Sequence, residues 1–386
     1  MRDILRELKS FFRKGDMILL ILCLATSAFG CLVLSSATNA EKFGNSTRYL
    51  VVQIGATLIG VALYAIVSSI DVEIFSEFRA LLTIFNVGIL LMLIPFGTDN
   101  HTGNRSWLDF PFLPFYIQPA EICKMFYILV TASVMASHQN RLSRPGSVIH
   151  MAAHLILIMG INIAISGDVG VSLIFAFIFI GMAWSGGVKA GWFLFGGGAI
   201  AAAAPVIWHS LDTYQKNRIL ILFDETVDPQ GIGARYHAKL SLQSLTGGGM
   251  TGQGLFNGNR TQAGAMPAQH TDFVFSSIGE ELGYLGCIVA LLLLIAIIAR
   301  CIWVGCRSTD FMRRLVCFGA AAAMIFQVCV NVGMCIGMVP VIGLTLPLIS
   351  YGGSSVVTVY AMLGLVSGVH ARPSPRSHER YIQPPR

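Results

Sequence analysis

The chain has 386 residues, of which 54% are hydrophobic and only 12% are charged, whereas soluble domains carry about 25% charged residues. This composition excludes an ordinary soluble domain and predicts a membrane protein. The formal net charge is +6, but no basic stripe is interleaved with aromatic residues, so nucleic-acid binding is not expected. The nine cysteines fall in apolar segments or at their edges without C-x-x-C spacing, so we expect neither a disulfide framework nor a cysteine metal site.

Apolar runs long enough to cross a bilayer core, which takes roughly 17 to 25 residues, recur about ten times along the chain. We therefore expect an all-α, polytopic membrane protein that forms a single domain over residues 1–386. The expected spans are Met17–Leu34, Leu50–Ile70, Ala80–Phe96, Pro119–Ser137, Val148–Ile165, Val169–Trp184, Gly191–Trp208, Phe273–Ala299, Met312–Gly337 and Thr345–Val369.

Lys and Arg concentrate in the two tails, residues 1–16 and 370–386, and in the joints that follow the fourth and eighth expected spans. Ten spans place these four segments on one side of the membrane, and the positive-inside rule makes that side cytoplasmic. We therefore expect both termini in the cytoplasm. Residues 209–272, between the seventh and eighth spans, then form one large extracellular loop.

The segment before the fourth expected span, G-N-R-S-W-L-D-F-P-F-L-P-F-Y, is rich in aromatic residues, which suit a membrane-water interface. Pro111 and Pro114 exclude a long helix here, so the segment is predicted to be a loop along the outer surface. The phenylalanines fit a simple interfacial belt. Arg105 and Trp107 lie together in the polar part and are candidates for contact with a substrate.

Two charged residues stand near the start of the fourth expected span. Gln118 precedes Pro119, which fits the first turn of a helix. Glu121 and Lys124 follow and share one helix face at positions i and i+3. Charges within a span usually pair with each other or face a cavity, so the sequence leaves two alternatives open. In the first alternative the two residues form a structural ion pair, and in the second they line a substrate-binding cavity.

Two aspartates precede apolar runs. Asp168, in S-G-D-V-G, is explained by a turn or by capping of the following helix, without any function. Thr271 or Asp272, in Q-H-T-D-F, would cap the eighth span, where the helix dipole favours a carboxylate. Asp272 also ends a long polar block, which makes it a candidate for catalysis.

That polar block is the only long one in the chain, with five basic and five acidic residues between 209 and 272. Long loops in compact proteins are usually functional or disordered. Lys216 and Arg218 open the block, and residues 235–245 are predicted to form a short amphipathic helix with Lys239 on one face. The run T-G-G-G-M-T-G-Q-G lacks the ending of a phosphate-binding loop, so it indicates only a bend or a close backbone approach.

Polar residues also interrupt the last three expected spans. Glu280 and Glu281 lie inside the eighth span, where acids are functional-site candidates by default, although a Lys or Arg of another span would explain one of them. The stretch from Asn331 through Ser350 and Ser354 is broken by Gly and Pro. Such backbone at membrane depth must be covered by protein or line a cavity, so we expect a second polar surface near the outer side.

Together these stretches resemble the SEDS family of membrane proteins, which includes RodA, FtsW and SpoVE. The segments Y-Q-K-N-R-I and Q-H-T-D-F are most similar to the RodA branch. The family has ten spans and a large outer loop between spans seven and eight, in agreement with the expected layout. The matching residues are Arg105, Ser106, Trp107, Gln118, Pro119, Glu121, Lys124, Asp168, Gly170, Tyr214, Arg218, Gln243, Ser244 and the glycine run that follows, Pro267, His270–Phe275, Glu280–Gly283 and Gly343–Ser355.

The resemblance implies a peptidoglycan glycosyltransferase that polymerises lipid II into glycan strands on the outer face of the bacterial cytoplasmic membrane during cell elongation. Asp272 is then the expected general base, because the attacking sugar hydroxyl must lose a proton outside the bilayer. The lipid diphosphate leaving group needs cationic groups or a divalent ion such as Mg²⁺ or Mn²⁺, and no cofactor besides such an ion is expected. The predicted substrate-binding residues are Arg105, Trp107, Glu121, Lys124, Lys216, Arg218, Lys239, Ser350 and Ser354, with supporting roles for Gln118, Pro119, Asp168, His270, Glu280, Glu281 and Asn331.

The partners that the resemblance implies are lipid II and a class B penicillin-binding protein, the transpeptidase that crosslinks the strands. The residues alone leave two other functions open. A transporter that flips lipid-linked precursor would also use intramembrane charges and broken helices, but it would need no base outside the membrane. A non-catalytic scaffold of the elongation or division machinery would tolerate substitution of Asp272.

Overall fold

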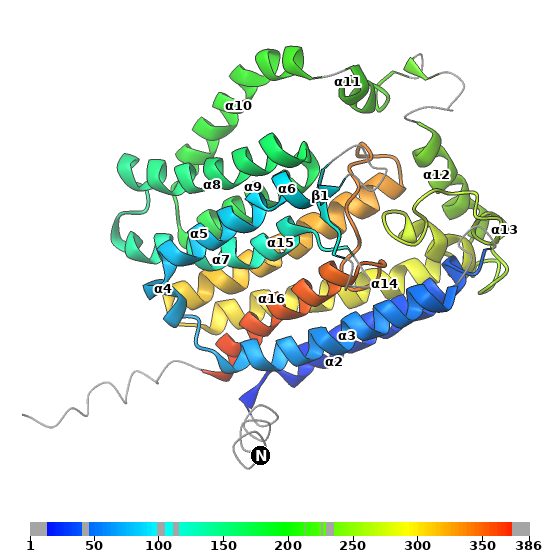
Figure 1. Cartoon of the computed structure of the whole chain (residues 1–386), viewed down its shortest axis with the longest axis horizontal. Coiled ribbons are helices and arrows are strands. Elements are labelled where there is room, and N and C mark those ends of the chain that lie inside the picture. Colours follow the sequence, from blue (N-terminus) through cyan, green and yellow to red (C-terminus); the bar gives the residue numbers. More distant parts are fainter. Residues whose placement is uncertain are drawn as a thin grey trace, which may run out of the picture.

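The computed structural model describes residues 14–40, 46–98, 105–110, 116–211, 213–224, 227–228 and 235–372. Most of the two predicted tails, together with Pro111 and Pro114, lies outside these ranges. The described chain is a bundle of long apolar helices, with several short helices and loops at one end (Figure 1). Its only strands, within these ranges, are β1 (Gly97–Thr98) and β2 (Trp107–Leu108), which form one antiparallel hairpin. The all-α prediction is therefore confirmed.

Nine helical segments of the described chain are long and apolar enough to cross a membrane. They are α2 (Met17–Ala37), α3 (Ser46–Ser69), α5 (Arg79–Leu91) with α6 (Leu93–Phe96), α7 (Pro119–Ser137), α8 (Pro145–Ser166), α9 (Val169–Gly186), α14 (Val274–Arg307), α15 (Phe311–Cys335) and α16 (Gly353–Ala371). The seventh expected span is α10 (Ala190–Ser210), whose apolar part, Ala190–Val206, is shorter. The shorter helices are α4 (Ile74–Glu77), η2 (Gln139–Arg141), α11 (Thr213–Leu220), α12 (Tyr236–Gly248) and α13 (Asn259–Gln262).

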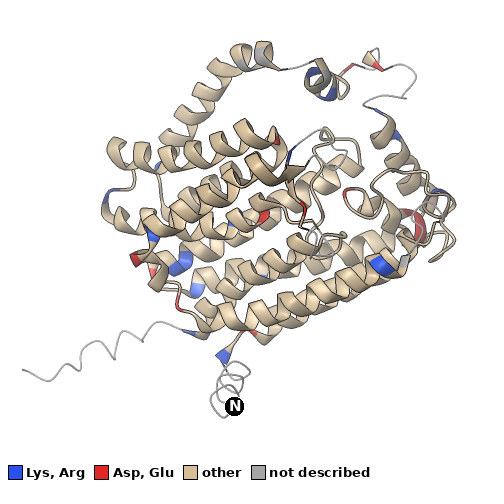
Figure 2. Ribbon diagram, viewed as in Figure 1, with Lys and Arg blue, Asp and Glu red and all other residues tan. Residues whose placement is uncertain are grey.

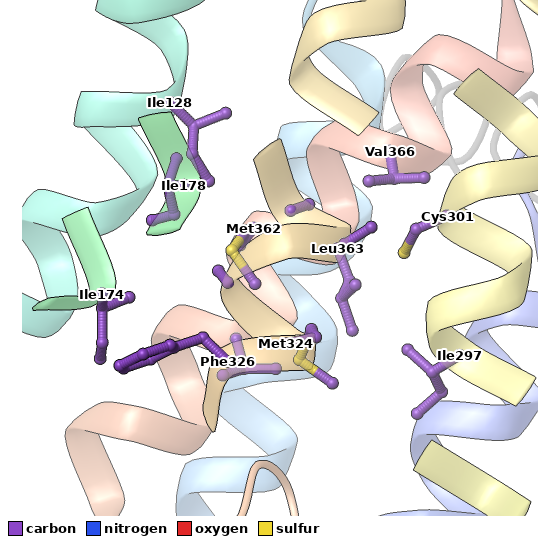
Figure 3. Close-up of a cluster of buried hydrophobic side chains, with 14 of the residues drawn as sticks. Ile128, Ile174, Ile178, Ile297, Cys301, Met324, Phe326, Met362, Leu363 and Val366 are labelled. Carbon is purple, nitrogen blue, oxygen red and sulfur yellow. The ribbon is translucent and has the colours of Figure 1, made fainter. Parts of the chain in front are cut away.

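The centre of the bundle is formed by α15 and α16, whose membrane-spanning parts are 72% and 83% buried. α16 packs along α3, while α15 packs against α14, α9 and α7. Figure 3 shows the apolar core between them, with Ile128 of α7, Ile178 of α9, Met324 of α15 and Leu363 of α16. The outer helix α8 is only 17% buried in the same measure, as expected for a helix that faces lipid.

The helix α10 departs from this packing. It rises away from the bundle and leads to α11 in the polar region (Figure 1). Its apolar side chains are widely exposed, with Leu194 at 77% and Phe195 at 69%. Exposed apolar side chains of this kind suit contact with acyl chains.

The long helix α14 is broken at Gly283, whose φ of 68° and ψ of −166° only glycine adopts readily. The break leaves the carbonyls of residues 280–281 and the N–H groups of residues 284–285 without partners in the helix. The loop 249–254 from the glycine run bonds all four, by donating to both carbonyls and accepting from both N–H groups, at 2.9 to 3.2 Å. A Cβ on Gly283 would lie 2.3 Å from the nitrogen of Gly252, so both glycines permit this close approach. The glycine run therefore completes the broken helix.

Two boundaries differ from the predictions by eight residues, and the others by four or fewer. The last span was expected to begin at Thr345, which is wrong, because α16 begins at Gly353 and residues 336–352 are non-helical turns and coil. The eighth span continues beyond its expected end to Arg307. The interruption between the last two spans and the amphipathic helix near residues 235–245 are confirmed, the latter as α12.

Candidate active site

Asp272 lies at the polar end of the bundle, two residues before α14. The carbonyls of the three consecutive residues His270–Asp272 each accept a hydrogen bond from the C-terminal part of the chain. The N–H of Tyr351 donates to the first (2.9 Å), Oγ of Ser350 to the second (2.5 Å) and Nδ2 of Asn331 to the third (2.8 Å). The backbone that carries Asp272 is therefore fixed to α15 and to the segment before α16. Ser350, predicted to bind substrate, uses its buried hydroxyl to hold this backbone.

Asp272 does not cap the helix that follows it. The N-cap residue of α14 is Phe273, and no side chain bonds to the first turn. Oγ1 of Thr271 instead donates to the carbonyl of Ala268 at 3.3 Å. The capping alternative is therefore wrong for both Thr271 and Asp272. The half-buried carboxylate of Asp272 makes no capping hydrogen bond to α14.

The surroundings of Asp272 make its carboxyl group a weak acid. Burial raises the pKa of Asp272 to about 6, the nearby charge of Asp168 adds to this rise, and a hydrogen bond with Thr271 opposes it. The loop before α16 approaches the carboxylate closely, since a Cβ on Gly343 would lie 3.5 Å from Oδ2. A carboxyl with this pKa exchanges protons near neutral pH, which suits a general base.

Asp168 caps α9, as predicted, because its Oδ1 accepts from the N–H of Val171 at 3.0 Å. Its Oδ2 accepts from Oγ of Ser106 at 3.4 Å. Burial raises the pKa of Asp168, while these two hydrogen bonds and the charge of Arg218 lower it. Asp168 thus joins the start of α9 to the segment around Ser106 and to the charged groups near Asp272.

The neighbours of Ser106 are the predicted substrate-binding residues Arg105 and Trp107. Nε of the exposed Arg105 donates to the carbonyl of Gly97 at 3.2 Å. The half-buried Trp107 pairs with Thr98 in the β1–β2 hairpin. Arg105 and Trp107 are therefore held by the hairpin on either side of Ser106, and their contact with a substrate stays a prediction.

Positive groups reach this region from α11 and α12. The guanidinium of Arg218 donates to the carbonyl of Val341 at 3.0 Å, and its charge acts on Asp168. Lys216 is half-buried on the same short helix, and Lys239 is exposed on α12. The structure therefore brings Arg218 near Asp168, whereas the roles predicted for the two lysines stay predictions.

The predicted pair in α7 is formed. Nζ of Lys124 lies 2.8 Å from Oε1 of Glu121, and both residues are buried, at 1% and 2% exposure. Pro119 occupies the first turn as predicted, and the N–H of Gln118 donates to Oγ of Ser354 at 3.3 Å, so the starts of α7 and α16 lie side by side. The ion-pair alternative is confirmed. A contact of this pair with substrate stays a prediction.

The two acids in α14 hold the polar loop. The carboxylate of Glu280 accepts from the N–H groups of Arg260 (3.0 Å) and Thr261 (2.9 Å) and from Oγ1 of Thr261 (2.6 Å). Oε1 of Glu281 accepts from Nε2 of Gln262 at 2.7 Å. A Lys or Arg of another span was one alternative for one of these acids. Among the described residues, Glu280 instead forms an ion pair with Arg260 of α13 at 3.8 Å, and Glu281 bonds to Gln262 of α13 and to Ser36 of α2. The loop segment before Asp272 is therefore fastened to α14.

The family model for FtsW, RodA and SpoVE, described as cell cycle proteins, matches residues 16–374 of the chain. The chain belongs to this family. This match confirms the resemblance found in the sequence and the prediction of a multi-pass membrane protein.

Similar proteins cover almost the whole chain. It is 31% identical over 369 residues to the peptidoglycan glycosyltransferase MrdB of Escherichia coli K12, a match over 94% of this chain and 95% of that protein. It is 33% identical over 368 residues to the probable peptidoglycan glycosyltransferase FtsW of Tolumonas auensis, with 92% and 90% covered. Among solved structures, the rod shape determining protein RodA of Thermus thermophilus matches with a TM-score of 0.68 and 25% identity over 94% of this chain and 98% of that one. A chain from a peptidoglycan synthase complex matches with a TM-score of 0.77 and 28% identity over 96% and 99%.

One residue of this family member's site, His237 on α12, was not among the predicted ones. Its ring stacks on that of Phe273, next to Asp272, with centroids 5.8 Å apart and planes 9° apart. Burial and the charge of Arg218 lower the pKa of His237, so the ring is neutral at pH 7. Its buried Nδ1 has no hydrogen-bond partner among the described residues. The sequence did show that His237 is a titratable residue inside the predicted amphipathic helix. It did not show which face of that helix turns towards the site.

The side chains suited to a metal ion are few. Within the described ranges, no group of three or more His, Cys, Asp or Glu side chains is arranged to hold one. Asp168 and Asp272 offer two carboxylates whose charges act on each other. Hard oxygen ligands of this kind suit Mg²⁺, which often takes its other ligands from water and from substrate phosphates.

Proposed function

We propose that this chain is a peptidoglycan glycosyltransferase in which Asp272 is the general base. Its family, and the names of relatives that align over more than nine tenths of the chain, support the activity. The observation that carries the role of Asp272 is a half-buried carboxylate with a pKa of about 6 on a backbone fixed by three consecutive hydrogen bonds. A base held in a fixed position with a pKa close to the working pH is what proton removal from a sugar hydroxyl requires.

The substrate that fits this site is lipid II, a disaccharide peptide on an undecaprenyl diphosphate. The 4-hydroxyl of the acceptor sugar attacks the anomeric carbon of the donor, the bond to the diphosphate breaks, and Asp272 takes the hydroxyl proton. Negative charge then grows on the leaving diphosphate, where fixed cationic groups are most effective. Arg218, whose charge already acts on Asp168, is the best placed of these groups, and Lys216, Lys239 and Lys124 are the further candidates.

A divalent cation, Mg²⁺ or Mn²⁺, would be held by Asp168 or Asp272 together with oxygens of the diphosphate, since the described residues offer no complete set of ligands. Such an ion would supply charge stabilisation for the leaving group. The part played by the chain itself is the positioning of the carboxylates and of Arg218.

The setting of the reaction follows from the charge bias of the sequence and from the relatives. Lys and Arg in the tails and in two joints support our proposal that both termini are cytoplasmic and that Asp272 lies at the outer face of the bacterial cytoplasmic membrane. One structural relative comes from a peptidoglycan synthase complex studied for polymerization and crosslinking. We therefore propose a class B penicillin-binding protein as the partner of this chain, with a role in cell elongation.

The test is polymerisation of purified lipid II by the purified chain with its cognate penicillin-binding protein. Asp272→Asn keeps the size of the side chain and removes the base, and Asp109→Asn, at an exposed position in the hairpin region, is the matched control. We expect Asp272→Asn to lose about a hundredfold or more, the scale of a general base, and the control to keep full activity.

Three outcomes are informative. Normal polymerisation by Asp272→Asn would mean that another group is the base. Transbilayer movement of lipid II without polymer would favour the transporter. A chain that recruits its partner but neither polymerises nor transports would be a scaffold.

A further inference from the structure

A cavity of about 380 Å³ lies at the end of the bundle remote from Asp272. It is formed where α14 and α16 end and where the chain enters α2, and it is lined by Lys14, Trp303, Arg307, His370 and Arg372, among others. α14 runs from its start near Asp272 to this cavity, a helix of 34 residues. The cavity therefore belongs to the opposite membrane surface, where Figure 2 shows many of the Lys and Arg residues.

The lining of the cavity is cationic. Lys14, Arg307 and Arg372 contribute three positive charges, and no Asp or Glu belongs to the lining. The guanidinium of Arg307 lies 4.2 Å from the ring centroid of Trp303, which orients it beside the cavity. The ring of His370 lies 6.2 Å from the same ring. Such a lining favours a ligand with negative charge.

The acids near the cavity are already paired with other groups. Asp16 forms two hydrogen bonds with Arg300, at 2.8 and 3.0 Å. Asp71 lies 3.0 Å from Arg313 and 3.8 Å from Arg372. Arg372 is further engaged by backbone carbonyls at the end of α3.

The remaining cations of the lining are uncompensated. Arg307 and Lys14 are both exposed, and no carboxylate lies within salt-bridge distance of either in the ranges that the structure describes. A cavity with two such cations can take up an anion without first breaking an ion pair.

The setting of the cavity points to a lipid. Its residues stand at the ends of membrane-spanning helices, which is the level of the headgroups, and Trp303, 37% exposed, is typical of that level. The adjoining helices α2 and α14 expose apolar side chains along their length, such as Ile18 (56%), Ile21 (63%) and Ile295 (54%). Acyl chains can lie against these faces while the phosphate enters the cavity.

We propose that this cavity binds the phosphate group of an anionic phospholipid of the surrounding bilayer. Arg307 and Lys14 bind the phosphate oxygens, and Trp303 packs against the headgroup at the interface. Basic cavities between transmembrane helices are known to recognise anionic headgroups in this way. The proposal does not depend on the reaction at Asp272, which lies at the other end of the bundle.

The proposal can be tested with the full-length chain in detergent by native mass spectrometry. The protein is titrated with dioleoyl-phosphatidylglycerol, with dioleoyl-phosphatidylcholine, or with phosphatidylglycerol in the presence of inorganic phosphate. The variant is Lys14→Gln/Arg307→Gln, in which both changed side chains are exposed, and the control is Arg79→Gln, an exposed basic residue outside the cavity. Thermal unfolding checks that the variants are folded.

We expect phosphatidylglycerol to bind more tightly than phosphatidylcholine. The double variant should weaken that binding about 30-fold, as the loss of two basic groups predicts, and the control should not. Equal binding of both lipids, or no loss in the folded double variant, would overturn the proposal. Displacement of the lipid by an equal concentration of inorganic phosphate would also overturn it, because the cavity would then be a site for a free anion.

Discussion

Polymerisation should depend on pH through the ionisation of Asp272. With a pKa of about 6, its carboxyl is roughly one tenth ionised at pH 5 and nine tenths ionised at pH 7. Only the ionised form can accept the proton of the sugar hydroxyl. The initial rate should therefore rise about tenfold between pH 5 and pH 7 and level off above that, if proton removal limits the rate.

The neighbouring Asp168 provides the decisive variant. Its charge raises the pKa of Asp272, so Asp168→Asn should lower that pKa and move the rise of the profile to lower pH. Asparagine caps a helix about as well as aspartate, so α9 should keep its cap. The assay is the initial rate of lipid II polymerisation between pH 5 and pH 8 for wild type, Asp168→Asn and the control Asp109→Asn. Equal wild-type rates at pH 5 and pH 7, or a profile that moves to higher pH in Asp168→Asn, would refute the reasoning.

The same pKa makes a prediction for stability. The folded-state pKa of Asp272 lies above the ordinary value of 3.8, so the native state holds the proton more tightly than the unfolded chain does. The protonated carboxyl of Asp272 therefore adds to the free energy of unfolding; this contribution is complete below pH 3.8 and is lost as the pH rises through about 6. The rise in pKa corresponds to at most about 3 kcal/mol, less because the side chain is partly exposed. At pH 7, Asp272→Asn should therefore be inactive yet no less stable than wild type, which thermal unfolding at pH 5 and pH 7 would show.

Three further changes test the supports of the site. Gly283→Ala should lower the free energy of unfolding by roughly 2 to 4 kcal/mol, because Gly283 has a positive φ and the new Cβ would lie 2.3 Å from a backbone nitrogen of the glycine-rich loop. The control is Gly160→Ala in α8, whose Cβ meets no atom within 4 Å and which should not change thermal unfolding measurably. Glu280→Ala removes the acceptor of three hydrogen bonds and should lower the free energy of unfolding by roughly 2 to 4 kcal/mol. Hydrogen exchange at residues 259–262 should become faster, and unchanged exchange there would contradict the attachment of the loop to α14. Asn331→Ala removes the side chain that donates a hydrogen bond to the carbonyl of Asp272 at 2.8 Å, so it should reduce the rate of polymerisation about tenfold. The midpoint of the pH–rate profile should stay near 6. A shifted midpoint would mean that the substitution acts directly on the carboxylate.

Features set by neighbouring residues could be predicted from the sequence. The spans follow from apolar runs, α12 from its amphipathic pattern, and the Asp168 cap from a Gly-Asp pair before an apolar run. The ion pair of Glu121 and Lys124 was one of the two alternatives that helical spacing left open. Each depends on residues a few positions apart, where the geometry of a helix fixes what meets what.

Features set by distant residues could not be predicted. Glu280 finds its partners 19 and 20 residues earlier, and the glycine run meets α14 at a break that a lone Gly283 does not reveal. His237 stacks on Phe273 only because α12 lies across the start of α14. Asp272 was expected either to cap a helix or to act as a base, and only the structure shows that the first alternative is wrong.

The hydrogen bonds that hold His270–Asp272 also set an order for the making of the protein. Their donors, Asn331, Ser350 and Tyr351, follow 59 to 81 residues later in the chain and leave the ribosome after it. Asp272 therefore gains its final position only when α15 and the segment before α16 have been made. A chain that stops before Asn331 would carry Asp272 without any of these three donors, so the cell would not be exposed to an active but unfinished polymerase.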